Sequence, residues 1–441
     1  MKVKKLIHNA KIVNEGRQFK GAVLIEDDRI AAIYEGDSPS FSIDPSSFTS
    51  IDADGALLLP GIIDTHVHFR EPGMTHKADI ESESRAALAG GVTSVLDMPN
   101  VNPPTTTLER WQERMALGAA KSRINYSYYI GATNELSFSN YPPSIPIKLF
   151  MGSSTGNMLV DKREALIRIF QYAAEHDVPV VAHCEDTPRI NERMAEAKQR
   201  WGDDPAVEHH SWIRDEEACY RSSSLAAQMA RETGARLHIA HITTARELEL
   251  LGGNVTGEVC VPHLLFTNDD YTTLGTRIKC NPAIKTRKDR EALRKALADG
   301  TLLTIGTDHA PHLLSEKQGG CQSAVSGMPM IQFSLVSMLG LVDEGVLSIE
   351  RMVDAMCHQP AMLFGIQERG FIRKGYKADL VLVQPKNWKL GIEDIFSKCG
   401  WSPLEGNNFH WQVKQTYVNG KLAFDNGEIY DTVRGEALIM K

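Results

Sequence analysis

Two histidines separated by one residue, His66 and His68, stand at the end of a short apolar run, and this feature constrains the chain more than any other. The run Ile62–Val67 follows a Pro-Gly break and has the composition of a buried β-strand. Residues two apart on a strand point to the same side, so the two imidazoles face one point. Neutral imidazoles that converge in this way suit a transition metal. The alternative, two histidines that only hydrogen-bond to the backbone, is disfavoured because more side chains of metal-ligand type lie further along the chain.

Further apolar runs of strand type follow, and helical patterns separate them. The eight runs are Ile62–Val67, Val92–Asp97, Ile124–Ile130, Ile147–Met151, Val178–His183, Arg236–His241, Gly257–Val261 and Leu302–Thr307. One intervening helix is predicted over Asp161–His176, with its apolar stripe at Leu166, Ile169, Phe170 and Ala173. Strands that alternate with helices predict a parallel α/β fold. The count favours a (β/α)8 TIM-type barrel over residues 59–369, with a doubly wound sheet as the alternative.

The two ends of the chain differ from this middle region. Residues 1–58 and 370–441 contain short strands and turns. The predicted elements are a hairpin over Ala22–Ile33, a loop over Glu35–Ser50, a strand over Asp379–Val383 and a hairpin around Asn419-Gly420, a dipeptide typical of type I′ turns. Neither end has enough strand to be stable alone. We therefore expect both ends to pair into one small β-sandwich module that flanks the barrel.

Composition excludes several classes of function. The chain has 441 residues, 42% of them apolar and 24% charged, as in an ordinary globular protein. A net charge of −8 without a basic block argues against nucleic-acid or anionic-membrane partners. Seven scattered cysteines without a Cys-x-x-Cys pair indicate neither a disulfide framework nor a zinc ribbon. With no signal peptide or membrane-length apolar stretch, we expect a cytoplasmic protein. If the protein associates with itself, the expected assembly is a homodimer.

Side chains of metal-ligand type recur at the ends of the predicted strands, where barrel enzymes place their chemistry. They are His66, His68, Lys148, His183, His241 and Asp308. Four histidines, an aspartate and a lysine exceed what one tetrahedral zinc needs, and they fit two metal ions close together. A plain Lys148 ammonium is repelled by such ions, whereas carboxylation by CO2 would make it an anionic bridge. The alternative is a lysine that forms a salt bridge at the barrel end.

At this point the chain resembles a known family. The motifs that carry the resemblance are Pro60–Gly73, Gly90–Thr93, Met98–Asn100, Cys280–Pro282, Gly306–His312 and Ala378–Leu382. They are similar to those of the amidohydrolase superfamily and, within it, of the dihydroorotases. The resemblance implies a binuclear zinc (β/α)8 hydrolase with a composite β-sandwich. Its small-molecule reaction would be the reversible opening of L-dihydroorotate to N-carbamoyl-L-aspartate in pyrimidine biosynthesis.

The resemblance also implies roles for single residues. The implied metal ligands are His66, His68, His183, His241 and Asp308, with carboxylated Lys148 as the bridge. The implied substrate contacts are His68, Arg70, Asn100, Asn281 and His312, and Asp308 would also carry the catalytic proton. Three features depart from the commoner pattern. The segment Val261-Pro262-His263 has one histidine where two are usual. Many bacterial relatives have an aspartate where Lys148 falls, and Asn281–Lys285 differs from the usual Asn-Pro-Pro-Leu-Arg.

The chemistry of the side chains agrees with this substrate. The planar guanidinium of Arg70 suits a carboxylate, and the amides of Asn100 and Asn281 suit a ring amide. Their alternatives are a surface salt bridge for the arginine and turn formation for the asparagines, each of which adjoins or lies near a proline. Two other functions stay open. One is a cyclic-amide hydrolase of allantoinase or hydantoinase type, whose substrates lack the carboxylate. The other is a metal-free homologue with a structural role, although this chain keeps all six ligand types.

Overall fold

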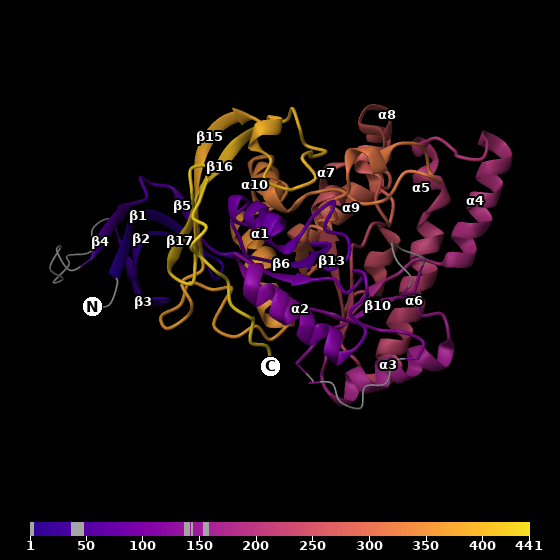
Figure 1. The fold of residues 1–441 in the computed structure, drawn as a ribbon, viewed down its shortest axis with the longest axis horizontal. Helices are drawn as coiled ribbons and strands as arrows, with labels where there is room; N and C mark the ends of the chain where they lie inside the picture. The colour runs from indigo at the N-terminus through magenta and orange to yellow at the C-terminus, as the bar shows by residue number, and fades with distance from the viewer. Residues whose placement is uncertain (1–3, 37–47, 136–141, 143, 153–157) are drawn as a thin grey trace.

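A computed structural model describes residues 4–36, 48–135, 142, 144–152 and 158–441 (Figure 1). Most of the loop predicted over Glu35–Ser50 lies outside these residues. The strands are β1 Lys4–Asn14, β2 Arg17–Glu26, β3 Arg29–Glu35, β4 Thr49–Asp52, β5 Leu57–Pro60, β6 Ile62–Val67, β7 Val92–Asp97, β8 Asn125–Tyr128, β9 Ile130–Gly131, β10 Ile147–Phe150, β11 Val180–His183, β12 Leu237–Ile239, β13 Val255–Cys260, β14 Thr304–Gly306, β15 Leu380–Lys389, β16 Asn408–Val418, β17 Lys421–Asp425 and β18 Glu428–Ile429. The helices are α1 Ile80–Ala89, α2 Leu108–Lys121, α3 Arg163–Glu175, α4 Thr187–Trp201, α5 His210–Ile213, α6 Glu216–Thr233, α7 Val261–Leu265, α8 Tyr271–Leu274, α9 Arg287–Ala298, α10 Ser334–Asp343, α11 Ile349–Val353 and α12 Gln359–Leu363.

The middle of the chain forms parallel sheets, as the sequence predicts. Strands β9 to β14 make one sheet in the order of the sequence, and β6, β7 and β8 make another. The predicted run Ile124–Ile130 divides into two strands, of which β8 pairs with β7 and β9 pairs with β10. A doubly wound sheet reverses its strand order at a switch point. This strand order has no reversal among the described residues, so the doubly wound alternative is wrong.

The first and last strands of this region lie side by side. The backbone N–H of Thr307, just after β14, donates to the Asp64 carboxylate on β6 at 3.2 Å. The backbone N–H of His68 donates to the carbonyl of His309 at 2.8 Å, and Val67 forms a parallel bridge with His309. These contacts bring the end of β6 next to the end of β14, and the predicted ligands at those ends come together.

Helices surround the parallel strands, with α1, α2, α3, α6, α9 and α10 around β6, β10 and β13 in Figure 1. Helix α3 confirms the predicted helical stripe, because Leu166, Ile169, Phe170 and Ala173 are all buried. Helix starts follow the sequence rules: Asp186 caps α4 and Asp215 caps α6, each by accepting a backbone N–H in the first turn. No helix in the described part of the chain is long and apolar enough to cross a membrane.

Strands from both ends of the chain form one nine-stranded sheet, at the left of Figure 1. Its order is β18-β17-β16-β15-β5-β1-β2-β3, with β4 beside β1. Early strand β5 pairs antiparallel with late strand β15, so the two ends meet at Leu58 and Leu382. Both predicted hairpins are confirmed as β2–β3 and β16–β17. In the second, Asn419 and Gly420 have φ values of 50° and 72°, as a type I′ turn requires.

Candidate metal centre

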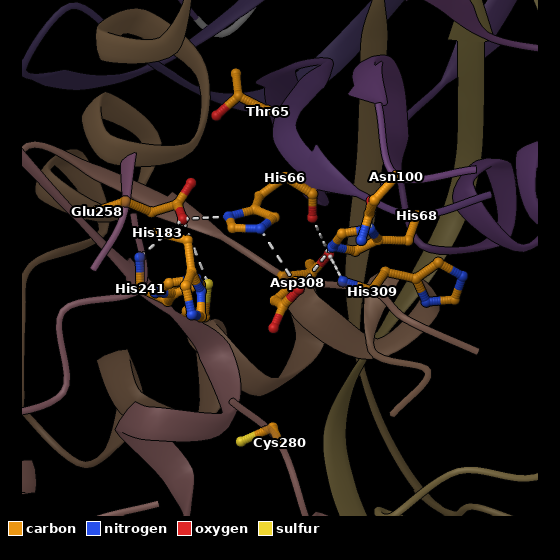
Figure 2. A network of polar contacts seen from close by, with 12 residues as sticks. Thr65, His66, His68, Asn100, His183, His241, Glu258, Cys280, Asp308 and His309 are labelled. Atoms are coloured by element: carbon orange, nitrogen blue, oxygen red, sulfur yellow. Dashed lines mark hydrogen bonds and ion pairs between the residues drawn. The ribbon is translucent and has the colours of Figure 1, made fainter. Parts of the chain in front are cut away.

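His66, His68 and Asp308 form the first part of the site, called here the Asp308 half (Figure 2). His66 Nδ1 lies 2.6 Å from Glu258 Oε1, and His68 Nδ1 lies 2.8 Å from Asn100 Oδ1. The Nε2 atoms of the two rings face Asp308 Oδ1 at 3.4 Å and 3.0 Å. Both rings are therefore held from behind at Nδ1 and present Nε2 to the same carboxylate oxygen.

This geometry fits a cation. When Nδ1 donates to Glu258 or Asn100, Nε2 of a neutral ring carries a lone pair. Burial lowers the pKa of His68 to about 4, so its ring is neutral near pH 7. Burial raises the pKa of Asp308, but His66 and His68 outweigh burial and the pKa lies below its usual value. Two lone pairs and a carboxylate that converge need a positive charge between them, and N and O donors of this kind bind transition metals such as zinc.

The second part of the site, called here the Lys148 half, consists of Lys148, His183 and His241. Lys148 lies within strand β10, His183 is the last residue of β11, and His241 stands two positions after the end of β12. His183 Nδ1 lies 2.9 Å from His241 Nε2, and the His66 and His241 ring centroids are 5.2 Å apart. Burial lowers the pKa values of His183 and His241, so both rings are neutral. Among the described residues, Lys148 Nζ and His241 Nδ1 are buried without a hydrogen-bond partner. A buried polar atom without a partner costs about 1–3 kcal/mol and calls for an explanation.

Three residues of the site have left-handed backbone conformations that side chains other than glycine rarely adopt. The φ values are 69° at Arg70, 37° at His241 and 48° at Asp308. Such conformations persist where the surrounding structure fixes them, and they gather at functional sites. Each of these residues stands two or three positions after the end of its strand, which is β6, β12 or β14.

Arg70 forms a cationic wall of the same cavity. Its guanidinium donates from Nε to the Pro311 carbonyl at 3.1 Å, and its Nη2 lies 2.9 Å from His312 Nε2. Within the described residues its Nη1 has no partner. Burial lowers the pKa of Arg70 only to about 10, so the group stays charged near pH 7. The cavity is lined by His66, His68, Arg70, Asn100, Lys148, Phe150, His183, His241, Asn281, Asp308, Ala310, Ser326 and Gly327.

Comparison with known proteins agrees with the geometry. The model of the amidohydrolase family matches residues 57–423. The chain belongs to the amidohydrolase family. It is 38% identical to a dihydroorotase of Halobacterium salinarum over 399 residues, which cover 89% of this chain and 92% of that one. It is 31% identical to a dihydroorotase of Lactobacillus gasseri over 438 residues, with 96% and 99% covered. A solved L-hydantoinase (dihydropyrimidinase) from Arthrobacter aurescens superimposes with a TM-score of 0.90 at 26% identity, covering 98% of both chains.

In this amidohydrolase all six predicted metal ligands line one cavity, together with Arg70, Asn100 and Asn281. His312 stands apart from the other predicted substrate contacts. It lies behind Arg70, and its Nδ1 is 3.1 Å from the ammonium of Lys77. The described cavity lining does not include it. Its position suits a residue that holds the guanidinium in place.

Sequence reasoning missed Glu258, which accepts from His66 Nδ1 and, at 3.2 Å, from the backbone N–H of His241. Burial raises the pKa of Glu258, but His66 outweighs burial and lowers it to about 2. The carboxylate is therefore charged and links the two halves of the centre. The available signal was a glutamate inside an apolar strand, β13. A charged side chain in a buried strand needs a partner.

Proposed function

We propose that this amidohydrolase is a dihydroorotase, which interconverts L-dihydroorotate and N-carbamoyl-L-aspartate. The observation that carries the proposal is the charged Arg70 guanidinium in the wall of the ligand-bearing cavity, with its Nη1 unpaired among the described residues. Dihydroorotate bears a carboxylate that such a group binds. The similar proteins from Halobacterium salinarum and Lactobacillus gasseri, both named dihydroorotase, support the same substrate.

The proposed cofactor is a pair of zinc ions, with His66, His68, His183, His241 and Asp308 as ligands and a carboxylated Lys148 as the bridge. The buried, unpartnered Nζ of Lys148 supports the modification. Burial lowers the pKa of Lys148 to about 8, and only the neutral amine reacts with CO2. Bound zinc would polarise the amide carbonyl of the ring and lower the pKa of the attacking water.

The residues of the chain then have defined tasks in hydrolysis. Arg70 holds the carboxylate, and Asn100 and Asn281 meet the amide groups of the ring. Asp308 takes a proton from the attacking water and delivers it to the ring nitrogen as the carbon–nitrogen bond breaks, because an amide nitrogen leaves poorly as an anion. In ring closure the same carboxylate removes that proton from the carbamoyl nitrogen. One group thus serves both directions.

The proposed scaffold is a closed (β/α)8 barrel over residues 59–369, with residues 1–58 and 370–441 as a composite β-sandwich. The sequential strand order and the contact between β6 and β14 support closure. A closed barrel places all strand ends on one rim, where the ligand types converge. The shared sheet, in which β5 pairs with β15, supports a module built from both ends.

The second candidate is a hydantoinase, which the structural similarity to the Arthrobacter aurescens L-hydantoinase favours. Arg70 distinguishes the candidates, because a hydantoin or allantoin ring offers it no carboxylate. A metal-free structural homologue is disfavoured by the full ligand set around one cavity.

The test is a ring-opening assay on zinc-loaded protein with L-dihydroorotate, dihydrouracil, hydantoin and allantoin side by side. Dihydrouracil is the matched control, since it is the same ring without the carboxylate. We expect turnover of dihydroorotate to exceed that of dihydrouracil by at least about tenfold in kcat/KM, the value of one charge-assisted contact. Preference for hydantoin or allantoin would refute the proposal.

A further inference from the structure

Asn281 lies in the cavity wall on the segment between α8 and α9. Its side-chain amide has two chemically opposite ends, a carbonyl oxygen that accepts hydrogen bonds and an NH2 group that donates them. An anionic or carbonyl oxygen of a substrate is bound by the NH2 end and repelled by the oxygen. The orientation of the Asn281 amide therefore decides which substrate groups this side of the cavity can bind. The neighbouring residues fix that orientation.

His210 is the first neighbour that sets the orientation. It is 2% exposed, at the start of α5, and its Nε2 lies 2.9 Å from the carbonyl oxygen of Cys280 and 3.2 Å from Asn281 Oδ1. A backbone carbonyl only accepts, so His210 Nε2 must carry the hydrogen. Burial lowers the pKa of His210 well below its usual value, which agrees with a neutral ring protonated at Nε2. The atom of Asn281 that faces His210 is therefore the oxygen.

Ser326 is the second neighbour. Its hydroxyl donates to Asn281 Oδ1 at 3.1 Å, and the residue itself lines the cavity. Two donors thus converge on Oδ1, and a flipped amide would place its NH2 against the fixed Nε2–H of His210. Nδ2 of Asn281 has no partner among the described residues. Asn281 and Arg70 both line the cavity, and among the described residues Nδ2 of Asn281 and Nη1 of Arg70 are donor groups without a partner.

We propose that His210 and Ser326 are positioning residues that set substrate specificity, because they lock Asn281 with its NH2 group toward the cavity. At these two positions the lining then presents hydrogen-bond donors, one from Asn281 and one from Arg70, and selects substrates whose facing groups are carboxylate or carbonyl oxygens. This inference rests on the proposed function and explains how the site recognises its substrate. Neither residue needs to touch the substrate itself.

The experiment compares His210→Phe and Ser326→Ala with wild-type protein. Each variant removes one donor to Oδ1, so we expect the KM for L-dihydroorotate to rise about three- to tenfold, as for the loss of one hydrogen bond, with kcat within about twofold. Ser326→Thr keeps the hydroxyl and should restore the wild-type KM. Asn281→Asp replaces the NH2 group by oxygen and should raise KM more than either, and adding Ser326→Ala to it should change KM little further.

Ser323→Ala is the matched control, because Ser323 lies on the same segment but bonds to Asp204 instead of Asn281. It should leave KM unchanged, and thermal unfolding should show that every variant is folded. A KM that stays within twofold of wild type in both Ser326→Ala and His210→Phe, or a loss in kcat alone, overturns the positioning role. Wild-type protein that does not open dihydroorotate instead refutes the proposed function, so the two failures are distinct.

Discussion

The two halves of the candidate metal centre are prepared in different ways. In the Asp308 half, Glu258 and Asn100 hold both imidazoles from behind, so their Nε2 atoms point at Asp308 without help from any added group. In the Lys148 half, the described structure leaves Lys148 Nζ and His241 Nδ1 buried without partners. In the Asp308 half the chain's own side chains orient both imidazole rings. Under the proposal, the other half needs a metal ion and a carboxylated Lys148 to satisfy these atoms, so the two halves should respond differently to substitution.

The largest effect is expected from Lys148→Ala. Loss of the bridging group should lower the metal content from about two ions per chain to about one or fewer, and should lower turnover by more than about 10³-fold. Short carboxylic acids such as acetate should restore part of both, since they replace the carbamate. Elemental analysis and the ring-opening assay measure these changes. A variant that keeps two metals and full activity would show that Lys148 is no ligand.

Asp308→Asn tests the other half. The substitution keeps the shape, and His66 and His68 stay in place, so part of the metal should stay bound. Turnover should fall by about 10²–10⁴-fold in both directions, the usual contribution of a general acid–base group. Added acetate should give no rescue, in contrast to Lys148→Ala. If the variant works within about tenfold of wild type, a step of roughly 1.4 kcal/mol, another residue carries the proton.

Arg70→Met should leave both halves intact and alter only substrate choice. Loss of one charge-assisted contact of about 1.5–3 kcal/mol predicts a fall of roughly tenfold to a few hundredfold in kcat/KM for dihydroorotate. Dihydrouracil turnover and metal content should change little. Arg70→Lys is the control, because it keeps the positive charge without the planar guanidinium. Its kcat/KM for dihydroorotate should lie between those of wild type and Arg70→Met. Near-normal dihydroorotate turnover in Arg70→Met would mean that the carboxylate is bound elsewhere.

The sequence predicts the strands next to the predicted metal ligands well because the signals of these strands are local. The runs Ile62–Val67 and Val92–Asp97 coincide with β6 and β7, since each begins with a β-branched residue directly after a glycine and is buried along its whole length. What the sequence does not reveal is which partner stands behind each ligand. Glu258 and His66 are 192 positions apart, and only the pairing of β13 with β14, which itself lies beside β6, brings them together. His210 meets Asn281 in the same non-local way.

Spacing along the chain also does not show which residues line the cavity and which lie behind its lining. His312 follows Asp308 by four residues, which suggests a place in the same cavity, yet the chain turns it behind Arg70 and against Lys77. The Ile124–Ile130 run reads as one strand, but it serves two sheets, with Tyr129 between β8 and β9. Both features depend on how neighbouring strands twist and pair, and no local pattern of residues records that.

Glu258→Gln tests whether the carboxylate behind His66 orients and polarises this imidazole for metal binding. The amide keeps the shape but loses the charge that polarises the imidazole, so metal affinity should fall about 10–100-fold. Competition with a chelator measures the Kd. Glu83→Gln is the matched control, because Glu83 is an equally buried carboxylate 2.8 Å from a histidine, His309, that is no predicted ligand. An equal loss of affinity in both variants would point to a general structural effect.

The smallest effect concerns the pH at which the Lys148 half is completed. Burial lowers the pKa of Lys148 from 10.5 to about 8, so the neutral amine becomes more than about a hundredfold commoner near pH 7 than in an exposed lysine. Only the neutral amine attacks CO2.

In metal-free protein at a fixed pressure of CO2, the rate of zinc-dependent reactivation should therefore rise with pH and level off above about pH 8, with about a tenfold gain from pH 6.5 to 8. The direction comes from the sign of the shift: a lowered pKa moves the reactive form to lower pH. Reactivation of the Asp308 half alone, measured as binding of the first zinc in Lys148→Ala, should lack this titration. The same pH profile in both proteins would assign it to the imidazoles and not to Lys148.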